Sequence, residues 1–170
     1  MAQNIFKGLG VALVTPFTSD GEVDYKALKR LVEYQLDNGT DFLCILATTS
    51  ENPCLTNEEK DNITNLIKDV VRGRIPILKY CGGNNTTAVI KEIEETNWSG
   101  IDGILSICPY YNKPSQEGLY QHFKAISAVS PLPMVMYNVP GRTGVNMSSA
   151  TTVRIARDCP NIIATKEASG

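Results

Sequence analysis

Residues 42–46 read Phe42-Leu43-Cys44-Ile45-Leu46, a continuous apolar run without polar alternation. Strands of this kind are typical of parallel sheets, in which helices cover both faces, whereas a half-exposed strand alternates apolar and polar side chains. The sequence before the run is helical, because Asp24 can cap a helix and apolar residues then recur at helical spacing until Asn38-Gly39. A strand-like run at 11–15 precedes that helix. The chain therefore opens with a strand, helix, strand unit.

The same alternation continues along the chain. Thr56 and Glu59 form the signature of a capping box ahead of a helix that ends near Arg72-Gly73. Later strands are predicted at 75–80, 103–107, 134–137 and from 162 onward, and later helices at about 87–97, 115–129 and 148–158. Six strands alternating with five helices predict an α/β fold with a parallel sheet. Either an open doubly wound sheet or part of a (β/α)8 TIM barrel fits this pattern.

The composition excludes several classes of protein. The 170 residues are 42% hydrophobic and 20% charged, as in an ordinary globular protein, and the net charge is −2. The interspersed charges give no basic stripe for a nucleic acid, and no apolar run is long enough to span a membrane. Met1–Asn4 lacks the apolar core of a signal peptide. We expect a cytoplasmic protein with neither nucleic acid nor membrane as a partner.

Metal and nucleotide chemistry have little support in the sequence. The five cysteines lack CxxC spacing, so we expect reduced thiols, with Cys44 and Cys108 packed inside strands. His122 is the single histidine and lies in a helical pattern, where a structural role is the expectation. No GxGxxG or Walker-type loop follows a predicted strand. These absences predict no metal and no bound nucleotide.

One lysine stands at the carboxyl end of the last apolar run. Lys166 follows Ile162-Ile163-Ala164-Thr165 and precedes the small residues Ala168-Ser169-Gly170. A buried ammonium is costly and a desolvated lysine loses its proton readily, so such an amine is a natural nucleophile for a carbonyl. The alternative is that Lys166 reaches solvent or pairs with Glu167.

Other polar side chains also follow predicted strands. Thr48-Thr49 follows the second strand and offers hydroxyls for a small anion, or ordinary loop capping. Tyr110-Tyr111 follows the fourth strand, in a loop that could instead fill an interface. Tyr137 ends the fifth strand, and Arg142 follows in a Gly/Pro turn, suited to a carboxylate or simply solvated. Because the carboxyl ends of parallel strands meet at one edge, this set predicts an imine-forming carbon–carbon bond enzyme for a small oxo acid.

The same motifs resemble the dihydrodipicolinate synthase family. They are Thr48-Thr49 with Glu51, residues 109–112, residues 137–144 and residues 166–170, in matching order over essentially the whole chain. The wider class comprises pyruvate-dependent lyases and aldolases on (β/α)8 barrels. The arginine of the Gly-Arg-Thr-Gly turn favours this family over N-acetylneuraminate lyase or a keto-deoxy sugar acid aldolase, which stay as alternatives.

The resemblance implies a role for each site residue. Lys166 would form an imine with pyruvate, and the derived enamine would add to L-aspartate 4-semialdehyde to give 4-hydroxy-tetrahydrodipicolinate in lysine biosynthesis. Tyr137 would donate and accept protons, linked through Thr48 to Tyr111 of a neighbouring subunit. Thr49, with Thr48, would hold the pyruvate carboxylate. Arg142 would bind the second substrate's carboxylate. No cofactor is implied, and a homo-oligomer is expected.

Two departures from the family pattern concern the pocket. Ala47 and Ser50 replace the glycines that usually flank the threonine pair, so a need for positive φ or close backbone approach there would strain the site. Asn84 and Tyr110 match the family's lysine feedback pocket. Asn57 and Ala88 stand where histidine and glutamate are common in regulated members, which predicts weak or no inhibition by lysine.

The length of the chain is the larger departure. A complete barrel needs about 250 residues. Residues 1–170 are therefore expected to form a single domain with the first six strands of a barrel, without the last two βα units and the C-terminal helices. Two interpretations follow from this expectation. The chain is either the synthase or the major portion of one, or a non-catalytic truncated homologue that keeps the site residues.

Overall fold

A computed structural model describes residues 5–170, so Met1–Asn4, the start that lacks a signal-peptide core, lies outside the described residues. The chain divides into two compact units. The first unit comprises Ile5–Tyr80 and Ser99–Asp102, and the second comprises Cys81–Trp98 and Gly103–Gly170. The expectation of a single domain stays a prediction. Within residues 5–170, no helix combines the length and apolarity that crossing a membrane requires.

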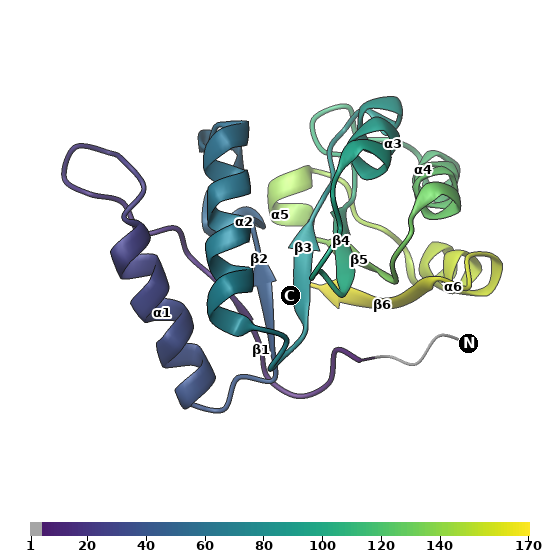
Figure 1. The fold of residues 1–170 in the computed structure, drawn as a ribbon. Coiled ribbons are helices and arrows are strands. Elements are labelled where there is room, and N and C mark those ends of the chain that lie inside the picture. The colour runs from purple at the N-terminus through teal and green to yellow at the C-terminus, as the bar shows by residue number, and fades with distance from the viewer. Residues whose placement is uncertain (1–4) are drawn as a thin grey trace. The chain divides into compact units, whose positions relative to one another are not determined.

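The first unit is a parallel three-stranded arrangement with two helices. Its strands follow chain order and are β1 (Gly10–Ala12), β2 (Phe42–Ile45) and β3 (Ile77–Tyr80), and its helices are α1 (Tyr25–Asp37) and α2 (Asn57–Val71). Val11 pairs with Leu43, and Leu43 in turn with Ile77. The two helices lie side by side (Figure 1). The strand, helix, strand alternation predicted around residues 42–46 is confirmed.

The helix boundaries of the first unit follow local capping chemistry. Asp24 caps α1 by accepting a 2.8 Å hydrogen bond from the Ala27 N–H. Thr56 and Glu59 form the predicted capping box of α2, with each side chain accepting from the other residue's backbone N–H. β3 begins at Ile77 rather than at 75, because Pro76 has no N–H to give to the ladder.

The second unit repeats the parallel pattern. Its strands, again in chain order, are β4 (Gly103–Ile107), β5 (Met134–Asn138) and β6 (Ile162–Glu167). Its helices are α3 (Thr86–Glu95), α4 (Gln116–Val129), α5 (Pro140–Thr143) and α6 (Ser149–Asp158). Helix α4 contacts both α3 and α6, which lie on either side of it in Figure 1.

Three short helical elements lie where the sequence predicted a turn and a loop. The Gly/Pro turn that carries Arg142 is the one-turn helix α5, because Pro140 suits the first helical position and Gly144 closes the helix at φ 71°. The threonine loop contains two 3-10 turns, η1 (Thr48–Ser50) and η2 (Asn52–Cys54). The sequence predicted a turn and a loop at these two places, but not their short helical conformation.

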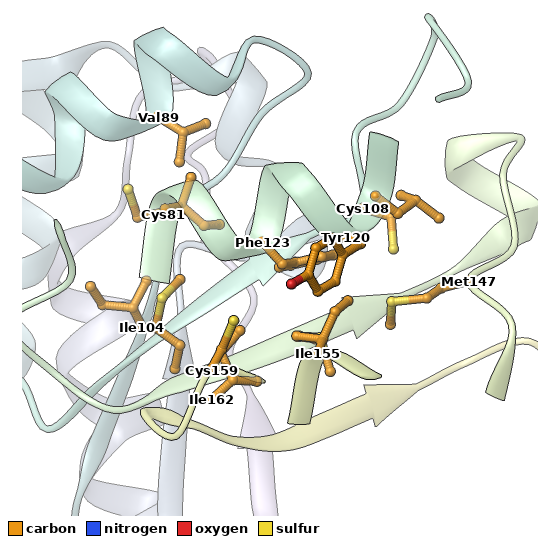
Figure 2. Close-up of a cluster of buried hydrophobic side chains, with 14 of the residues drawn as sticks. Cys81, Val89, Ile104, Cys108, Tyr120, Phe123, Met147, Ile155, Cys159 and Ile162 are labelled. Carbon is orange, nitrogen blue, oxygen red and sulfur yellow. The ribbon is translucent and has the colours of Figure 1, made fainter. Parts of the chain in front are cut away.

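A cluster of buried apolar side chains holds the second unit together. Figure 2 shows Ile104, Phe123, Ile155 and Ile162 among its members, which come from strands and helices. His122 is buried beside Phe123, with ring centroids 5.3 Å apart, as expected of a structural histidine. Cys108 is likewise buried and free, in line with its predicted packing role.

Candidate active site

Lys166 and Tyr137 face each other near the carboxyl ends of neighbouring strands. They are direct partners in the register of β5 and β6. Lys166 Nζ lies 4.4 Å from the centroid of the Tyr137 ring. Tyr137 is buried and Lys166 is half-buried, so the amine is presented at the strand end against a fixed phenol. The structure thus brings together the predicted nucleophile and the predicted proton donor.

A bulge in β6 sets the face on which Lys166 lies. Met134 pairs with Ile162, but the next residue, Val135, pairs with Ala164. Ile163 is therefore extra, and the pairing after it is shifted by one residue. Side chains alternate between the faces of a strand, so a change of one residue moves every later side chain to the opposite face. The bulge is what places Lys166 opposite Tyr137.

Arg142 is carried by the short helix that follows β5. Its side chain is exposed. The Thr143 hydroxyl fixes the turn by donating to the carbonyls of Val139 and Val145, at 3.2 and 2.9 Å. A guanidinium on such an anchored turn can bind a carboxylate that approaches the strand ends.

Tyr111 lies in a loop with an unusual backbone. Tyr111 and Lys113 have φ values of 69° and 45°, in the left-handed region that non-glycine residues seldom adopt. Asn112 ties this loop to the segment directly before α3 by donating from Nδ2 to the Asn84 carbonyl at 3.0 Å. Tyr111 is 87% exposed. The structure presents this phenol outward, and its predicted hydrogen bond to Thr48 stays a prediction.

Thr48 and Thr49 belong to the first unit, directly after β2. Thr48 is half-buried and Thr49 is exposed. Two hydrogen bonds join their turn to the segment after β1. The Ser50 hydroxyl donates to the Leu13 carbonyl at 2.7 Å, and the Thr15 hydroxyl donates to the Ser50 carbonyl at 2.8 Å. The predicted link from Thr48 to Tyr137 joins the two units and stays a prediction.

Ala47 and Ser50 do not strain the threonine turn. Ala47 has φ −83° and ψ −167°, an ordinary extended conformation. Ser50 is not among the described non-glycine residues with positive φ, whereas Leu46 and Glu51, at 56° and 55°, are. Ala47 and Ser50, which replace glycines of the family pattern, therefore have no positive φ. The positive φ values belong to their outer neighbours, Leu46 and Glu51.

Two functional candidates were missed by the sequence reasoning, namely Asn138 and Glu167. Asn138 follows Tyr137 and is 1% exposed. Its side-chain Nδ2 donates to both carboxylate oxygens of Glu167 at 3.0 Å. This bond is the main cause that holds the pKa of the Glu167 carboxyl below its usual value. Burial, the second-largest effect, raises this pKa, and weaker effects of hydrogen bonds to Ser169 and Ala168 lower it. The one signal in the sequence is an asparagine at the end of an otherwise apolar strand.

The reactive groups of the described chain are an amine, phenols, hydroxyls and a guanidinium. Among residues 5–170, no three His, Cys, Asp or Glu side chains come together in the way a metal ion requires. An amine beside a phenol suits covalent chemistry on a carbonyl, in which the phenol moves protons.

Known proteins match this chain over almost all of its length. The model of the dihydrodipicolinate synthetase family matches residues 5–170. The 4-hydroxy-tetrahydrodipicolinate synthase of Parabacteroides distasonis is 60% identical over 170 residues, 100% of this chain and 57% of that protein. The crystal structure of dihydrodipicolinate synthase from Thermotoga maritima has a TM-score of 0.93 at 44% identity, over 98% of this chain and 56% of that one. The chloride-inhibited dihydrodipicolinate synthase of Acinetobacter baumannii, complexed with pyruvate, has a TM-score of 0.90 at 45% identity, over 95% and 55%.

The chain spans a little over half the length of these relatives, 57% in the Parabacteroides distasonis protein. The structural agreement decides between the two sheet architectures, because the matching structures are TIM barrels. The fold is α/β, with six parallel strands of a (β/α)8 barrel, as predicted. Sequence, site geometry and fold agree, and the chain belongs to the dihydrodipicolinate synthetase family.

Proposed function

We propose that this chain carries the imine-forming centre of a 4-hydroxy-tetrahydrodipicolinate synthase. The observation that carries the proposal is the position of Lys166 Nζ, 4.4 Å from the Tyr137 ring centroid near the carboxyl ends of β5 and β6. An unprotonated amine there attacks the keto carbon of pyruvate, and water leaves as the imine forms. Loss of a methyl proton then gives the enamine, which forms a carbon–carbon bond with the aldehyde of L-aspartate 4-semialdehyde.

Tyr137 is suited to the proton transfers of this sequence. Its ring is fixed by burial on β5 beside the amine, so its hydroxyl has one position relative to the strand end. A positioned acid and base contributes a rate factor of about 100 to 10,000. We assign to Tyr137 the proton that the keto oxygen needs to leave as water, and the proton that returns to the new alkoxide.

The other assignments follow the family resemblance. Thr48 passes the proton between Tyr137 and Tyr111, Thr49 and Thr48 hold the pyruvate carboxylate, and Arg142 holds the carboxylate of the aldehyde substrate. The exposure of the Tyr111 phenol suits a residue that serves a neighbouring subunit, so a homo-oligomer is part of the proposal. The protein would work in the cytoplasm in lysine biosynthesis. No cofactor is required, because the protonated imine itself accepts the electrons when the methyl proton leaves.

Reductive trapping tests the proposal directly. Borohydride is added to the chain with pyruvate, and peptide mass mapping locates the reduced adduct. We expect the adduct on Lys166 and its loss in Lys166→Ala. Lys124 is a matched internal control, because its Nζ also lies over a tyrosine ring, 5.6 Å from the centroid of Tyr120, but on helix α4. A folded chain without an adduct on Lys166, or with equal modification of Lys124, contradicts the proposal and favours a non-catalytic homologue.

A further inference from the structure

The side chain of Asn138 uses all of its hydrogen-bonding capacity. Its Nδ2 donates to both carboxylate oxygens of Glu167, at 3.0 Å each, and to Asn146 Oδ1 at 2.7 Å. Its Oδ1 accepts from the Met147 backbone N–H at 3.0 Å and from the Cys108 thiol at 3.8 Å. A carboxamide has two donors and two acceptor sites, so none is left over. This buried group therefore connects four other residues around the end of β5.

The partners of Asn138 allow only one polarity. The Met147 backbone N–H can only donate, and an ionised Glu167 carboxylate can only accept. Burial first, and the Glu167 charge second, raise the pKa of the Cys108 thiol to about 12, so the thiol keeps its proton and donates. The position thus needs an acceptor toward Met147 and Cys108 and a donor toward Glu167. Aspartate matches asparagine in shape but supplies no donor toward Glu167.

The Asn138–Glu167 contact lies one step beyond the Tyr137–Lys166 pair. Asn138 pairs with Glu167 in the same β5 and β6 register, and the Ala168 N–H donates to the Asn138 carbonyl at 2.9 Å. The Ser169 N–H donates to Glu167 Oε1 at 2.9 Å and ties the following turn to the same carboxylate. Cys108 and Met147, which anchor Asn138, belong to the buried cluster of Figure 2. The amide therefore links the end of β6 to the packed core.

Because of the bulge at Ile163, this link affects the position of Lys166. It leaves one unmatched residue in β6, so the strand could pair with β5 in a second register by taking up that residue. In that register Lys166 would lie on the opposite face of the strand from Tyr137. A contact after the bulge that bonds only in the observed register removes this freedom. Asn138 with Glu167 is such a contact.

We propose that Asn138 is a positioning residue for the amine of Lys166, acting through the carboxylate of Glu167. The inference rests on the proposed function, because Lys166 is taken as the nucleophile. It does not require Asn138 or Glu167 to touch a substrate. Both lie on the face opposite to Tyr137 and Lys166, since side chains of adjacent residues alternate.

An exchange of donor and acceptor between the two residues separates positioning from general destabilisation. Asn138→Asp turns two carboxylates toward each other and removes the donor. Adding Glu167→Gln restores one donor and one acceptor with their places exchanged, and the pair again carries one negative charge. In this double variant, Asn146 can turn its own amide to donate to the new carboxylate at position 138. The shape of the site is nearly constant throughout.

Asn161→Asp is the matched control. Asn161 precedes β6 before the bulge, and its Nδ2 donates to the Ser127 carbonyl at 2.7 Å. This variant therefore also replaces an amide donor by a carboxylate next to β6. It leaves the pairing after the bulge untouched.

The first measurement is the rate of borohydride-trapped pyruvate adduct on Lys166, per folded molecule as measured by circular dichroism. We expect Asn138→Asp to lower this rate about 10- to 100-fold, since small misplacements of a reacting group have effects of this size. The double variant should return to within about threefold of the wild type, given coupling between contacting residues. Asn161→Asp should react like the wild type. A wild-type rate in Asn138→Asp, or no rescue in the double variant, overturns the inference.

A second measurement does not need pyruvate and separates this inference from the proposed function. Acetic anhydride labels lysine amines, and the labelling of Lys166 relative to Lys124 reports the surroundings of its amine. We expect the ratio to change at least about threefold in Asn138→Asp and to return in the double variant. An unchanged ratio overturns the inference. If the labelling ratio changes in Asn138→Asp and returns in the double variant, but the wild type forms no pyruvate adduct, the proposed function is contradicted and the positioning of Lys166 is supported.

Discussion

Tyr137 supplies the aromatic surface over which Lys166 lies, with Nζ 4.4 Å from the ring centroid, and its hydroxyl extends beyond that contact. Ring and hydroxyl therefore have separable roles. The ring packs in the second unit and faces the amine, whereas the hydroxyl is the group that can move a proton.

Tyr137→Phe should keep the ring and remove the proton transfer. We expect the pyruvate adduct on Lys166 to form about 100-fold more slowly or worse, because a positioned acid and base contributes at least that factor. Stability against denaturant should change little. Trapping kinetics and urea unfolding measure the two effects. Tyr120→Phe is the control, since the Tyr120 hydroxyl bonds Asp158 at 2.9 Å and serves helix packing. Equal adduct rates in wild type and Tyr137→Phe would remove Tyr137 from the mechanism.

Arg142→Ala should weaken the binding of L-aspartate 4-semialdehyde and leave the reaction with pyruvate unchanged. Arg142 is exposed on α5, so its removal should leave folding and the pyruvate adduct unchanged. Loss of a charged hydrogen bond costs about 1.5–3 kcal/mol, which corresponds to about a 10- to 100-fold higher KM for L-aspartate 4-semialdehyde. Steady-state assays that vary one substrate at a time measure this effect. Arg157→Ala, at the end of α6, is a control that changes charge equally. An unchanged KM in Arg142→Ala contradicts the assignment.

Local chemistry explains why much of the fold could be predicted. The capping residues Asp24, Thr56, Ser115 and Ser148 each accept a backbone hydrogen bond at the start of a helix. Such signals act within four residues, so they can be read from the chain alone. Continuous apolar runs likewise indicated the parallel strands. Both kinds of signal can be recognised in the sequence without knowledge of tertiary contacts.

The remaining features depend on pairing between distant residues. The extra residue Ile163 is an ordinary strand residue in the sequence and is a bulge only in relation to β5. Asn138 gave no sign of its partner Glu167, which lies 29 positions later. Leu46 and Glu51 adopt positive φ without glycine, so composition gave no warning. The sequence predicted that Lys166 and Tyr137 meet at one edge of the sheet, but it did not predict the register that aligns them.

Thr56→Ala should weaken the first unit through helix α2. The Thr56 side chain accepts from the Glu59 N–H at 3.2 Å, and removal of such a cap costs about 1 kcal/mol. We expect the urea midpoint to fall by a corresponding amount. Thr56→Ser keeps the hydroxyl and should stay near the wild type. If alanine and serine lower the midpoint equally, the cap is not the cause.

Acid should destabilise the second unit through His122. One ring nitrogen, Nδ1, lies 2.9 Å from the Thr86 hydroxyl, while Nε2 is buried without a hydrogen-bond partner among residues 5–170. Burial lowers the pKa of His122 from 6.5 to about 4, so the folded chain keeps this ring neutral. Below 6.5 the unfolded chain binds a proton that the folded chain does not, and stability falls as the pH drops toward 4.

Comparison with His122→Asn isolates this contribution from the carboxylates that titrate in the same range. Asparagine can still bond the Thr86 hydroxyl, and its lost packing lowers stability equally at both pH values. Between about pH 7 and about pH 4.5, the wild type should lose about 2 kcal/mol more unfolding free energy than the variant. Urea titrations of both proteins at the two pH values measure the difference. Parallel losses would show that the folded chain can accommodate a charged His122, and the buried Nε2 would then need a partner that forms only in acid.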